Sequence, residues 1–295
     1  MRVIITGGAG FIGQRLTDAL IEKGHQITVF DHHPPSSGVA FVQVDLAGQE
    51  LPAELFQNVD AIIHLAGRNI FARWNQQVKK QIYDSRIVGT RGLVKSLSRL
   101  ARKPEVFISA SAVGFYGDRG EENLDESSTQ GSDFLAKVCT DWEKEALVAR
   151  NYGIRTVQVR TAPVLGAGGL LAKVAPLYKL GLGGPLGSGN HWFPWVHLRD
   201  IVNIYVSALE NSDIRGPVNA CSPHLVRNIE FSRVLAQIMH RPHLFKVPRW
   251  AVRLVFGDLA DVVLSSQKVH PVVLTRTGYQ FVFPYIRKAL ETLYR

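Results

Sequence analysis

The chain has 295 residues, a formal net charge of +9 and 46% hydrophobic residues. A chain of this length and hydrophobicity can bury a large core, which excludes intrinsic disorder as its main state. Its two cysteines are too few for a disulfide framework and form no Cys-x-x-Cys pair, which excludes a disulfide scaffold and a structural zinc module. There is no run of 18 apolar residues and no signal-peptide pattern. We therefore expect a soluble cytoplasmic protein with no membrane partner.

Short apolar strands alternate with helical stretches from residue 3 onward. Between residues 11 and 23, apolar side chains recur at helical spacing, and Gly24 follows as a signal for the end of a helix. Strands are predicted at 3–5, 26–30, 40–44, 61–65, 106–109, 155–159 and 218–220. This alternation is typical of an α/β fold with a doubly wound parallel sheet, the Rossmann architecture.

The second half of the chain has a different composition. Residues 166–169 and 181–189 are rich in glycine, which is unsuited to regular core elements. Helices are predicted at 198–210, 228–239 and 248–256, and a short strand followed by a helix at 279–293. We expect a dinucleotide-binding domain over 1–165, to which 196–222 return, and a smaller C-terminal substrate lobe over most of 166–295.

Basic residues concentrate near the C-terminus. Residues 223–295 carry 11 basic and 4 acidic side chains. Such a lobe would steer a phosphate- or carboxylate-bearing substrate, although a solvated basic surface explains the excess equally well. No RNA- or DNA-binding pattern accompanies the charge, so nucleic acid is not favoured as a partner. The expected partner is a small-molecule substrate, anionic in one interpretation, and a homodimer remains an option.

A glycine motif follows the first predicted strand and opens the first predicted helix. Gly8, Gly10 and Gly13 form the pattern G-x-G-x-x-G. Glycine at these positions permits a tight turn, close approach of the backbone to a pyrophosphate, and close packing of helix on strand. The helix N-terminus adds free N–H donors. The motif therefore predicts a bound dinucleotide at this turn.

The end of the second strand bears on the choice between NAD and NADP. Asp31 closes that strand, where its carboxylate can accept hydrogen bonds from ribose hydroxyls and would repel a 2′-phosphate. This favours NAD, although a protonated His32 or His33 would offset the repulsion. Asp31 and His32 are thus candidate cofactor contacts. No cluster of His, Cys or Asp has the spacing of metal ligands, so we expect no metal.

Several motifs together resemble a known family over nearly the whole chain. Residues 6–13 (TGGAGFIG) are similar to the start of extended short-chain dehydrogenases/reductases, and 64–67 (HLAG) resemble their fourth-strand motif. Other stretches resemble an atypical branch called the epimerase-family proteins, which are sugar-nucleotide-epimerase-like and carry a C-terminal domain of unknown function. These stretches are 73–74, 85–86, 109–118, 142–143, 181–189, 194–200 and 276–290.

The resemblance implies cofactor contacts beyond the three motif glycines. Asp45, after the third strand, lies where the family places an adenine contact. By their positions in the family's motifs, further residues are expected near the cofactor. They are Gly7, Phe11, Ile12, Leu65, Ala66, Gly67, Arg86 and Val164.

The resemblance also implies a catalytic mechanism that this chain only partly supports. Family members pair Tyr-x-x-x-Lys on one helix with an upstream Ser, and the tyrosine exchanges a proton with the substrate while hydride moves. Ser111 keeps the serine position and Lys137 the lysine position, but Asp133 precedes the lysine and no Tyr-x-x-x-Lys occurs in the chain. Tyr116 is the candidate substitute. A solvated charged face explains Lys137 equally well, and a packed aromatic explains Tyr116 somewhat better than catalysis does.

The sequence thus predicts an NAD(P)-dependent oxidoreductase or epimerase. Ser111 would orient the substrate oxygen, Tyr116 or a water would relay the proton, and Lys137 would hold the cofactor's ribose. The substrate would be a small hydroxyl- or carbonyl-bearing molecule, with a nucleotide sugar as one option. A second interpretation stays open because Tyr-x-x-x-Lys is missing. In it, the protein binds a dinucleotide without catalysis and serves as a redox sensor or a scaffold.

Overall fold

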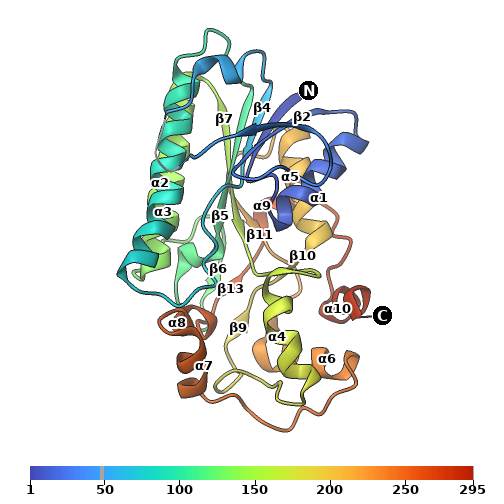
Figure 1. Cartoon of the computed structure of the whole chain (residues 1–295). Helices are drawn as coiled ribbons and strands as arrows, with labels where there is room; N and C mark the ends of the chain where they lie inside the picture. The colour runs from blue at the N-terminus through green and yellow to red at the C-terminus, as the bar shows by residue number, and fades with distance from the viewer. Residues whose placement is uncertain (47–49, 295) are drawn as a thin grey trace.

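A parallel sheet forms the centre of the protein. In the computed structural model, which describes residues 1–46 and 50–294, seven strands pair in the order β11-β7-β5-β4-β1-β2-β3 (Figure 1). All neighbouring pairs in this sheet are parallel. The strands are β1 (Arg2–Thr6), β2 (Gln26–Asp31), β3 (Ala40–Gln43), β4 (Ala61–His64), β5 (Val106–Ala112), β7 (Arg155–Thr161) and β11 (Gly216–Ala220). The predicted Rossmann sheet is confirmed.

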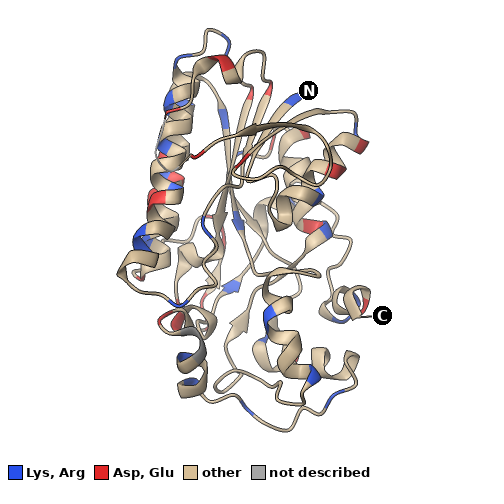
Figure 2. Cartoon of the chain, viewed as in Figure 1, with Lys and Arg blue, Asp and Glu red and all other residues tan. Residues whose placement is uncertain are grey.

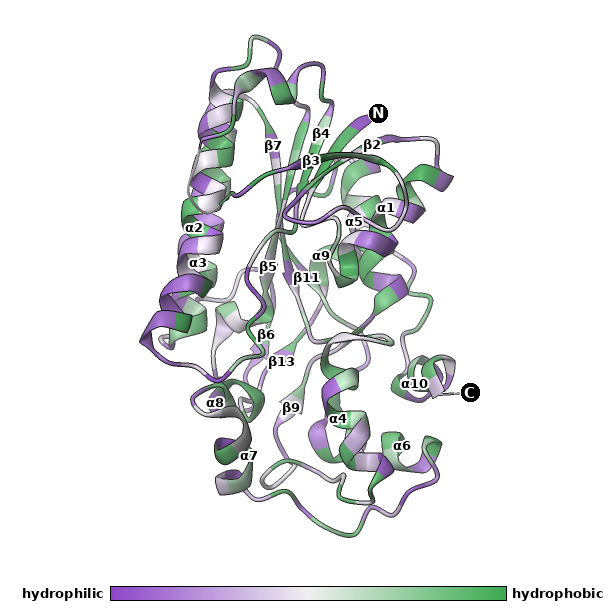
Figure 3. Ribbon diagram, viewed as in Figure 1, coloured by the Kyte–Doolittle hydropathy of each residue, from purple (hydrophilic) through white to green (hydrophobic). Residues whose placement is uncertain are grey.

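Helices cover both faces of the sheet. The helices α1 (Phe11–Glu22) and α5 (Leu198–Glu210) pack together on one face, and α2 (Gln76–Ser98) and α3 (Phe134–Leu147) pack together on the other (Figure 1). Side chains of a strand alternate between the faces. Ile5 of β1 therefore belongs to a buried cluster with α1 and α5, whereas Ile4 belongs to one with α2. Figure 3 shows the strands as mostly apolar, as burial on both faces requires.

Shorter elements connect the sheet to the lobe beyond its C-terminal edge. The lobe core is a separate cluster that includes the buried side chains of Leu171, Trp195, Phe231 and Leu290. The helices of this region are α4 (Gly169–Lys179), α6 (Asn228–Ile238), α7 (Arg249–Phe256), α8 (Leu259–Val263) and α10 (Ile286–Tyr294). Paired short strands are β6 (Asn123–Leu124) with β13 (Lys268–Val269), β8 (Val164–Leu165) with β10 (Val196–His197), and β9 (Trp192–Phe193) with β12 (Val226–Arg227). Short 3-10 helices are Ala53–Phe56, Val113–Tyr116 and Val148–Tyr152.

The C-terminal segment does not lie wholly in the lobe. The helix α9 (Val272–Arg276) packs against β11, and its Leu274 is fully buried in the sheet's core cluster. Part of the segment predicted as lobe therefore lies against the sheet, and the domain boundary at residue 165 stays a prediction. Among the described residues, no helix is long and apolar enough to span a bilayer.

The short strand predicted near residue 279 is wrong. Residues 279–285 form an irregular segment that leads into α10. Its backbone N–H groups at Val282 and Phe283 donate to the two carboxylate oxygens of Asp200, at 2.7 and 2.9 Å. A buried carboxylate thus takes the hydrogen bonds that a strand would give to a neighbouring strand.

Candidate functional site

The turn between β1 and α1 leaves no room for side chains. Gly7 has φ +73°, and a Cβ atom there would lie 2.8 Å from the amide nitrogen of Ala66. A Cβ atom on Gly13 would lie 2.3 Å from the carbonyl oxygen of Gly7. Gly10 stands at the N-cap position of α1 and supplies no side-chain hydrogen bond, and the first turn has no acidic residue. The turn therefore presents backbone without side chains, and no side chain caps the N-terminus of the helix.

The glycine turn opens into a cleft of about 870 Å³ beyond the C-terminal ends of β1, β2 and β4. Ligands of doubly wound sheets bind at this edge. Of the residues predicted to contact a cofactor, the cleft is lined by Gly7, Gly10, Asp31, His32, Asp45, Leu65, Ala66 and Gly67. The structure therefore brings together residues from four separate stretches of the sequence.

Other predicted cofactor residues lie around this cleft rather than in its wall. Gly8 packs on β2, because a Cβ atom there would lie 2.7 Å from a methyl group of Val29. The ring of Phe11 lies against Gly166 and Gly168, so it joins the turn to the segment that enters α4. Ile12 and Val164 pack against the core cluster of the sheet, as Gly13 packs against the turn itself. Gly8 and Gly13 therefore shape the turn, whereas Ile12 and Val164 contribute to the core beside it.

Asp31 is tied to the backbone of the cleft. Its Oδ2 accepts from the N–H of Ala9 at 3.0 Å, and its Oδ1 accepts from the N–H of His32 at 2.7 Å. The carboxylate is half-buried and therefore fixed in orientation at the end of β2. Each oxygen keeps acceptor capacity for a further donor, since a carboxylate offers about four lone-pair sites.

His64 supports the segment that follows β4. The ring is fully buried, with Nδ1 2.6 Å from Oγ1 of Thr6 and Nε2 2.9 Å from Oγ1 of Thr90. Because the Thr90 hydroxyl donates to the carbonyl of Arg86, Nε2–H of His64 is the donor and Nδ1 the acceptor. Burial lowers the pKa of His64 to about 3. The imidazole is therefore neutral near pH 7.

This histidine is expected to make stability depend on pH. In the unfolded chain an imidazole has a pKa near 6.5, so between about pH 6.5 and pH 3 the unfolded state binds more protons. Neutral His64 makes its whole contribution to the free energy of unfolding above pH 6.5. That contribution falls as the pH falls, and at pH 5 it is smaller by about 2 kcal/mol. Urea unfolding at pH 7 and pH 5 should show this loss, and His64→Gln should remove most of it. An equal loss in the variant would contradict the assignment.

Arg86 lies behind the glycine that closes this segment. A Cβ atom on Gly67 would be 3.2 Å from Cζ of Arg86, whose Nη1 donates to the carbonyls of Arg68 and Ile82. The guanidinium lies 5.1 Å from the ring centre of Trp142. Burial lowers the pKa of Arg86 to about 10, so it stays charged near neutral pH. Within the described residues no carboxylate pairs with it, and Arg86 is not among the residues that line the cleft, so it places a buried positive charge behind the cleft wall.

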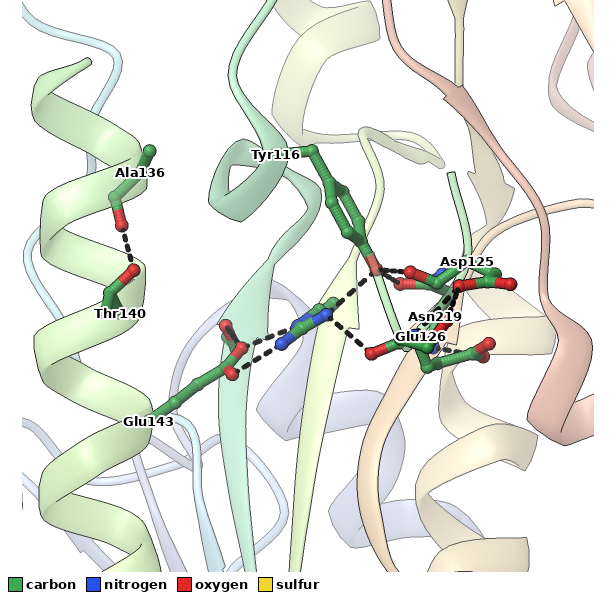
Figure 4. A network of polar contacts seen from close by, with 10 residues as sticks. Tyr116, Asp125, Glu126, Ala136, Thr140, Glu143 and Asn219 are labelled. Atoms are coloured by element: carbon green, nitrogen blue, oxygen red, sulfur yellow. Dashed lines mark hydrogen bonds and ion pairs between the residues drawn. The ribbon is translucent and has the colours of Figure 1, made fainter. Parts of the chain in front are cut away.

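Ser111, near the C-terminal end of β5, belongs to a buried ion-pair network that includes Glu143. Figure 4 shows Glu143 and the contacts around it. The Ser111 hydroxyl donates to Oε1 of Glu143 at 2.6 Å. Both oxygens of Glu143 accept from the guanidinium of Arg160, each at 2.8 Å. Burial by itself would lower the pKa of Arg160, but hydrogen bonds and charge from Glu143 outweigh it and raise that pKa. Ser111 is therefore held by a fixed charge pair.

Tyr116 faces the same network from the opposite side. It is fully buried, and its hydroxyl oxygen lies 2.7 Å from Oδ1 of Asn219 and 2.9 Å from the carbonyl oxygen of Asp125, which share its one proton as acceptors. It also accepts from Nη1 of Arg160 at 2.9 Å (Figure 4). Burial raises the pKa of Tyr116. This geometry favours the packed aromatic over the catalytic alternative that the sequence left open for Tyr116.

Lys137 lies on the outer face of α3. Its side chain is 67% exposed, and its Nζ is 2.7 Å from Oδ2 of Asp141. The buried face of the helix instead carries Cys139 and Glu143. The structure therefore does not bring Lys137 together with Ser111, and it favours the solvated charged face. A ribose-binding role for Lys137 stays a prediction without support from this geometry.

Sequence reasoning missed the groups that surround Ser111. Arg160 lies in the buried strand β7, and its partner Glu143 lies 17 residues earlier on α3. The thiol of Cys139 is buried, which raises its pKa to about 12 and keeps it protonated near neutral pH. Only the charge of Arg160 inside a buried strand was a usable signal, because a buried charge needs a partner.

Comparison with known proteins extends over the whole chain. The family model described as "NAD dependent epimerase/dehydratase family" matches residues 3–221, and one described as a domain of unknown function matches residues 247–293. An Arabidopsis thaliana protein named "Epimerase family protein SDR39U1 homolog, chloroplastic" is 38% identical, over 99% of this chain and 86% of the relative. The Bacillus subtilis epimerase family protein YfhF is 33% identical, over 99% and 98%.

Solved structures agree with this likeness. The human epimerase family protein SDR39U1, crystallised with NADPH, is 34% identical and superposes with a TM-score of 0.90 over 99% of both chains. A UDP-glucuronic acid 4-epimerase from Bacillus cereus shares the fold, with a TM-score of 0.81 at 19% identity over 100% of this chain and 98% of its own. With its glycine turn, its parallel sheet and these matches, the chain belongs to the NAD dependent epimerase/dehydratase family.

Proposed function

We propose that this protein binds NAD or NADP in the cleft and uses it to transfer hydride to or from a small hydroxyl- or carbonyl-bearing substrate. The observation that carries the proposal is the tight glycine turn, in which Gly7 and Gly10 line the cleft and Gly13 packs the helix directly on the turn. Bare glycine backbone of this kind suits a pyrophosphate, which must approach the chain closely. The human epimerase family protein SDR39U1, which is 34% identical, was crystallised with NADPH, and this supports the same class of ligand here.

The described residues fit both halves of a dinucleotide. The uncapped N-terminus of α1 would hold the pyrophosphate, and Asp31 would accept hydrogen bonds from the adenosine ribose. The segment from Leu65 to Gly67 would lie along the ligand, and Arg86 behind it would supply a positive charge to the nicotinamide half. The volume of the cleft lies within the range of cofactor sites.

The chemistry would involve only a few protein groups. When bound, the nicotinamide supplies or accepts the hydride. Ser111 keeps the family's serine position, and because its hydroxyl donates to Glu143, its oxygen would accept a hydrogen bond from a substrate hydroxyl. Because Tyr116 is fully buried and Lys137 lies on the exposed face of α3, away from Ser111, a water would relay the proton. A nucleotide sugar is one option for the substrate, because the basic C-terminal segment would attract its phosphates.

The first experiment identifies the dinucleotide itself. Mass and absorbance spectra of any cofactor that copurifies are recorded, followed by titration with NAD(H) and NADP(H). A tightly held cofactor indicates hydride recycling within one turnover, as in an epimerase, and an exchangeable one indicates a dehydrogenase. Absence of binding to either dinucleotide would overturn the proposal.

Asp31 is expected to set the balance between the two cofactors. Its carboxylate would repel a 2′-phosphate, so Asp31→Asn should shift the ratio of the NADP and NAD dissociation constants toward NADP by about tenfold. Fluorescence titration with NADH and NADPH measures this ratio. Asp18→Asn, at an exposed ion pair of α1, is the matched control. A wild-type protein that binds NADP more than tenfold tighter than NAD would contradict the preference.

A second candidate function is cofactor binding without turnover, as in a redox sensor or a scaffold. One observation favours it: neither Tyr116 nor Lys137 reaches Ser111 as a proton donor. Hydride exchange is therefore measured on a panel of alcohols, aldehydes and nucleotide sugars. Turnover that Ser111→Ala abolishes, with cofactor binding intact, supports the enzyme. Tight binding with no exchange on any substrate supports the sensor.

A further inference from the structure

The lobe ends in a group of exposed apolar side chains. Among the residues whose exposure the structure describes, the six most exposed large hydrophobic side chains all lie in two segments, 179–187 and 241–254, which we call the lobe tip. They are Leu180 (73%), Leu182 (59%), Leu244 (77%), Phe245 (66%), Trp250 (69%) and Leu254 (71%). Folded proteins rarely expose apolar groups together in this way without a partner.

The two segments of the lobe tip lie side by side. Leu186 and Val247 form a parallel bridge, and the N–H of Val247 donates to the carbonyl of Pro185 at 2.9 Å. Gly184 packs so closely that a Cβ atom there would lie 1.9 Å from the carbonyl oxygen of Phe245. The exposed leucines of one segment and the phenylalanine of the other therefore belong to one surface. This surface lies at the end of the molecule remote from the sheet (Figure 1).

The helix α7 continues this surface. Trp250 and Leu254 are four residues apart, so they share one face of the helix, while Val252 on the opposite face is buried. The ion pair between Lys79 of α2 and Asp258, just after α7, fixes the helix against the sheet domain. The apolar face is thus held outward by the fold.

Positive charge accompanies the apolar groups. The lobe tip contains Lys179, Arg241, Lys246, Arg249 and Arg253, and no Asp or Glu. In Figure 2 the loop between α6 and α7 carries blue segments and no red ones, so its charged residues are all Lys or Arg. Within the described residues, only one of these cations forms an ion pair, between Arg253 and Asp261 at 2.9 Å. The surface therefore combines Leu, Phe and Trp with unneutralised cations.

We propose that the lobe tip docks on a lipid bilayer with anionic headgroups. Aromatic and leucine side chains of one helical face bury at the boundary of headgroups and acyl chains, and flanking Lys and Arg meet the anionic lipids. A protein partner of ordinary surface composition would have to match individually the four cations that form no ion pair within the described chain, whereas an anionic bilayer neutralises them together. No described helix could span a membrane, and the lobe tip would lie on a bilayer without crossing it.

Docking would leave the cofactor cleft accessible. None of the residues that line the cleft lies in 179–187 or 241–254. The proposal is therefore independent of the proposed function, and either can fail without the other. It predicts an enzyme or sensor held at a membrane surface with its cleft open to water.

Vesicle flotation tests the binding itself. The full chain is mixed at low ionic strength with phosphatidylcholine vesicles, with or without about 30% phosphatidylglycerol. We expect it to float with the anionic vesicles, to be released by added salt, and to stay behind with pure phosphatidylcholine. Failure to float with anionic vesicles at low salt would overturn the proposal.

Trp250 provides a spectroscopic readout of the depth of binding. It is 69% exposed, whereas Trp74, Trp142 and Trp195 are at most 8% exposed. Anionic vesicles should shift the tryptophan emission to shorter wavelength, and brominated acyl chains should quench it. Trp250→Phe should keep flotation and lose most of the shift. An unshifted wild-type spectrum on bound vesicles would assign the binding to another surface.

Paired variants separate the apolar and charged contributions. Trp250→Ser with Leu254→Ser should weaken vesicle binding about tenfold or more, because both side chains leave the boundary region. The matched control is Ile21→Ser with Tyr152→Ser, at exposed apolar positions of the sheet domain, and it should bind as the wild type does. Lys246→Gln with Arg249→Gln should remove the preference for anionic lipid.

A second copy of this chain is the other partner that could cover the lobe tip. Sedimentation equilibrium without vesicles distinguishes the two. If the wild type is a dimer and the double variant Trp250→Ser with Leu254→Ser is a monomer, the lobe tip binds a second copy of the chain and not a membrane. Circular dichroism of each variant should match that of the wild type, since all four positions of the apolar and charged pairs are exposed. Equal vesicle binding by the apolar pair and the wild type would also overturn the proposal.

Discussion

Gly13→Ala is expected to reduce dinucleotide affinity by about 100-fold and to lower the free energy of unfolding by about 2 kcal/mol. The new methyl carbon would lie 2.3 Å from the carbonyl oxygen of Gly7 and 2.7 Å from Cα of Gly8. Both are backbone atoms of the turn, so the turn itself must move. A displaced turn no longer directs its N–H groups at a pyrophosphate, and losing about two hydrogen bonds to a charged group accounts for the affinity.

Fluorescence titration with NADH and NADPH, together with urea unfolding, measures both effects. Gly89→Ala is the matched control, because Gly89 also lies inside a helix but a Cβ atom there would meet its nearest neighbour, the carbonyl oxygen of Leu46, at 3.4 Å. That variant should fold with unchanged or slightly greater stability, since alanine favours helix over glycine. Unchanged cofactor affinity in Gly13→Ala would place the dinucleotide elsewhere.

The sheet was predictable because it rests on local patterns. Most strands of the sheet contain a short run of apolar residues, and the alternation of their side chains between the two faces follows from the period of two. The glycine turn was predictable for a similar reason: a steric requirement at one turn leaves a signal within eight residues. Only the strand near residue 279 failed, because the partner of its backbone is Asp200, about 80 residues earlier.

The buried corner around Ser111 was not predictable, because it is assembled from distant elements. Arg160, Glu143 and Ser111 come from β7, α3 and β5, and no spacing in the sequence indicates that they meet. Motif position alone placed Lys137 at the site. The buried positions of α3 at 135, 138, 139, 142 and 146 recur at helical spacing and leave 137 outside. That periodicity is present in the sequence and predicts that Lys137 lies on the exposed face of the helix.

Arg160→Met is expected to lower the free energy of unfolding by about 3–5 kcal/mol. The variant removes both hydrogen bonds from the guanidinium to Glu143 and leaves that carboxylate buried, with the Ser111 hydroxyl as its remaining donor. It also removes the bond from Nη1 to the Tyr116 hydroxyl. Urea unfolding of the variant and the wild type measures the loss. A loss below about 1 kcal/mol would contradict a desolvated ion pair.

Replacing both partners separates the charge pair from the rest of the corner. Arg160→Met with Glu143→Leu should recover most of the stability lost in either single variant, because no uncompensated charge stays buried. The double variant also frees the Ser111 hydroxyl from its acceptor. If the double variant binds cofactor as the wild type does but loses turnover, the pair positions Ser111 for substrate. Retained turnover would instead assign the pair to stability alone.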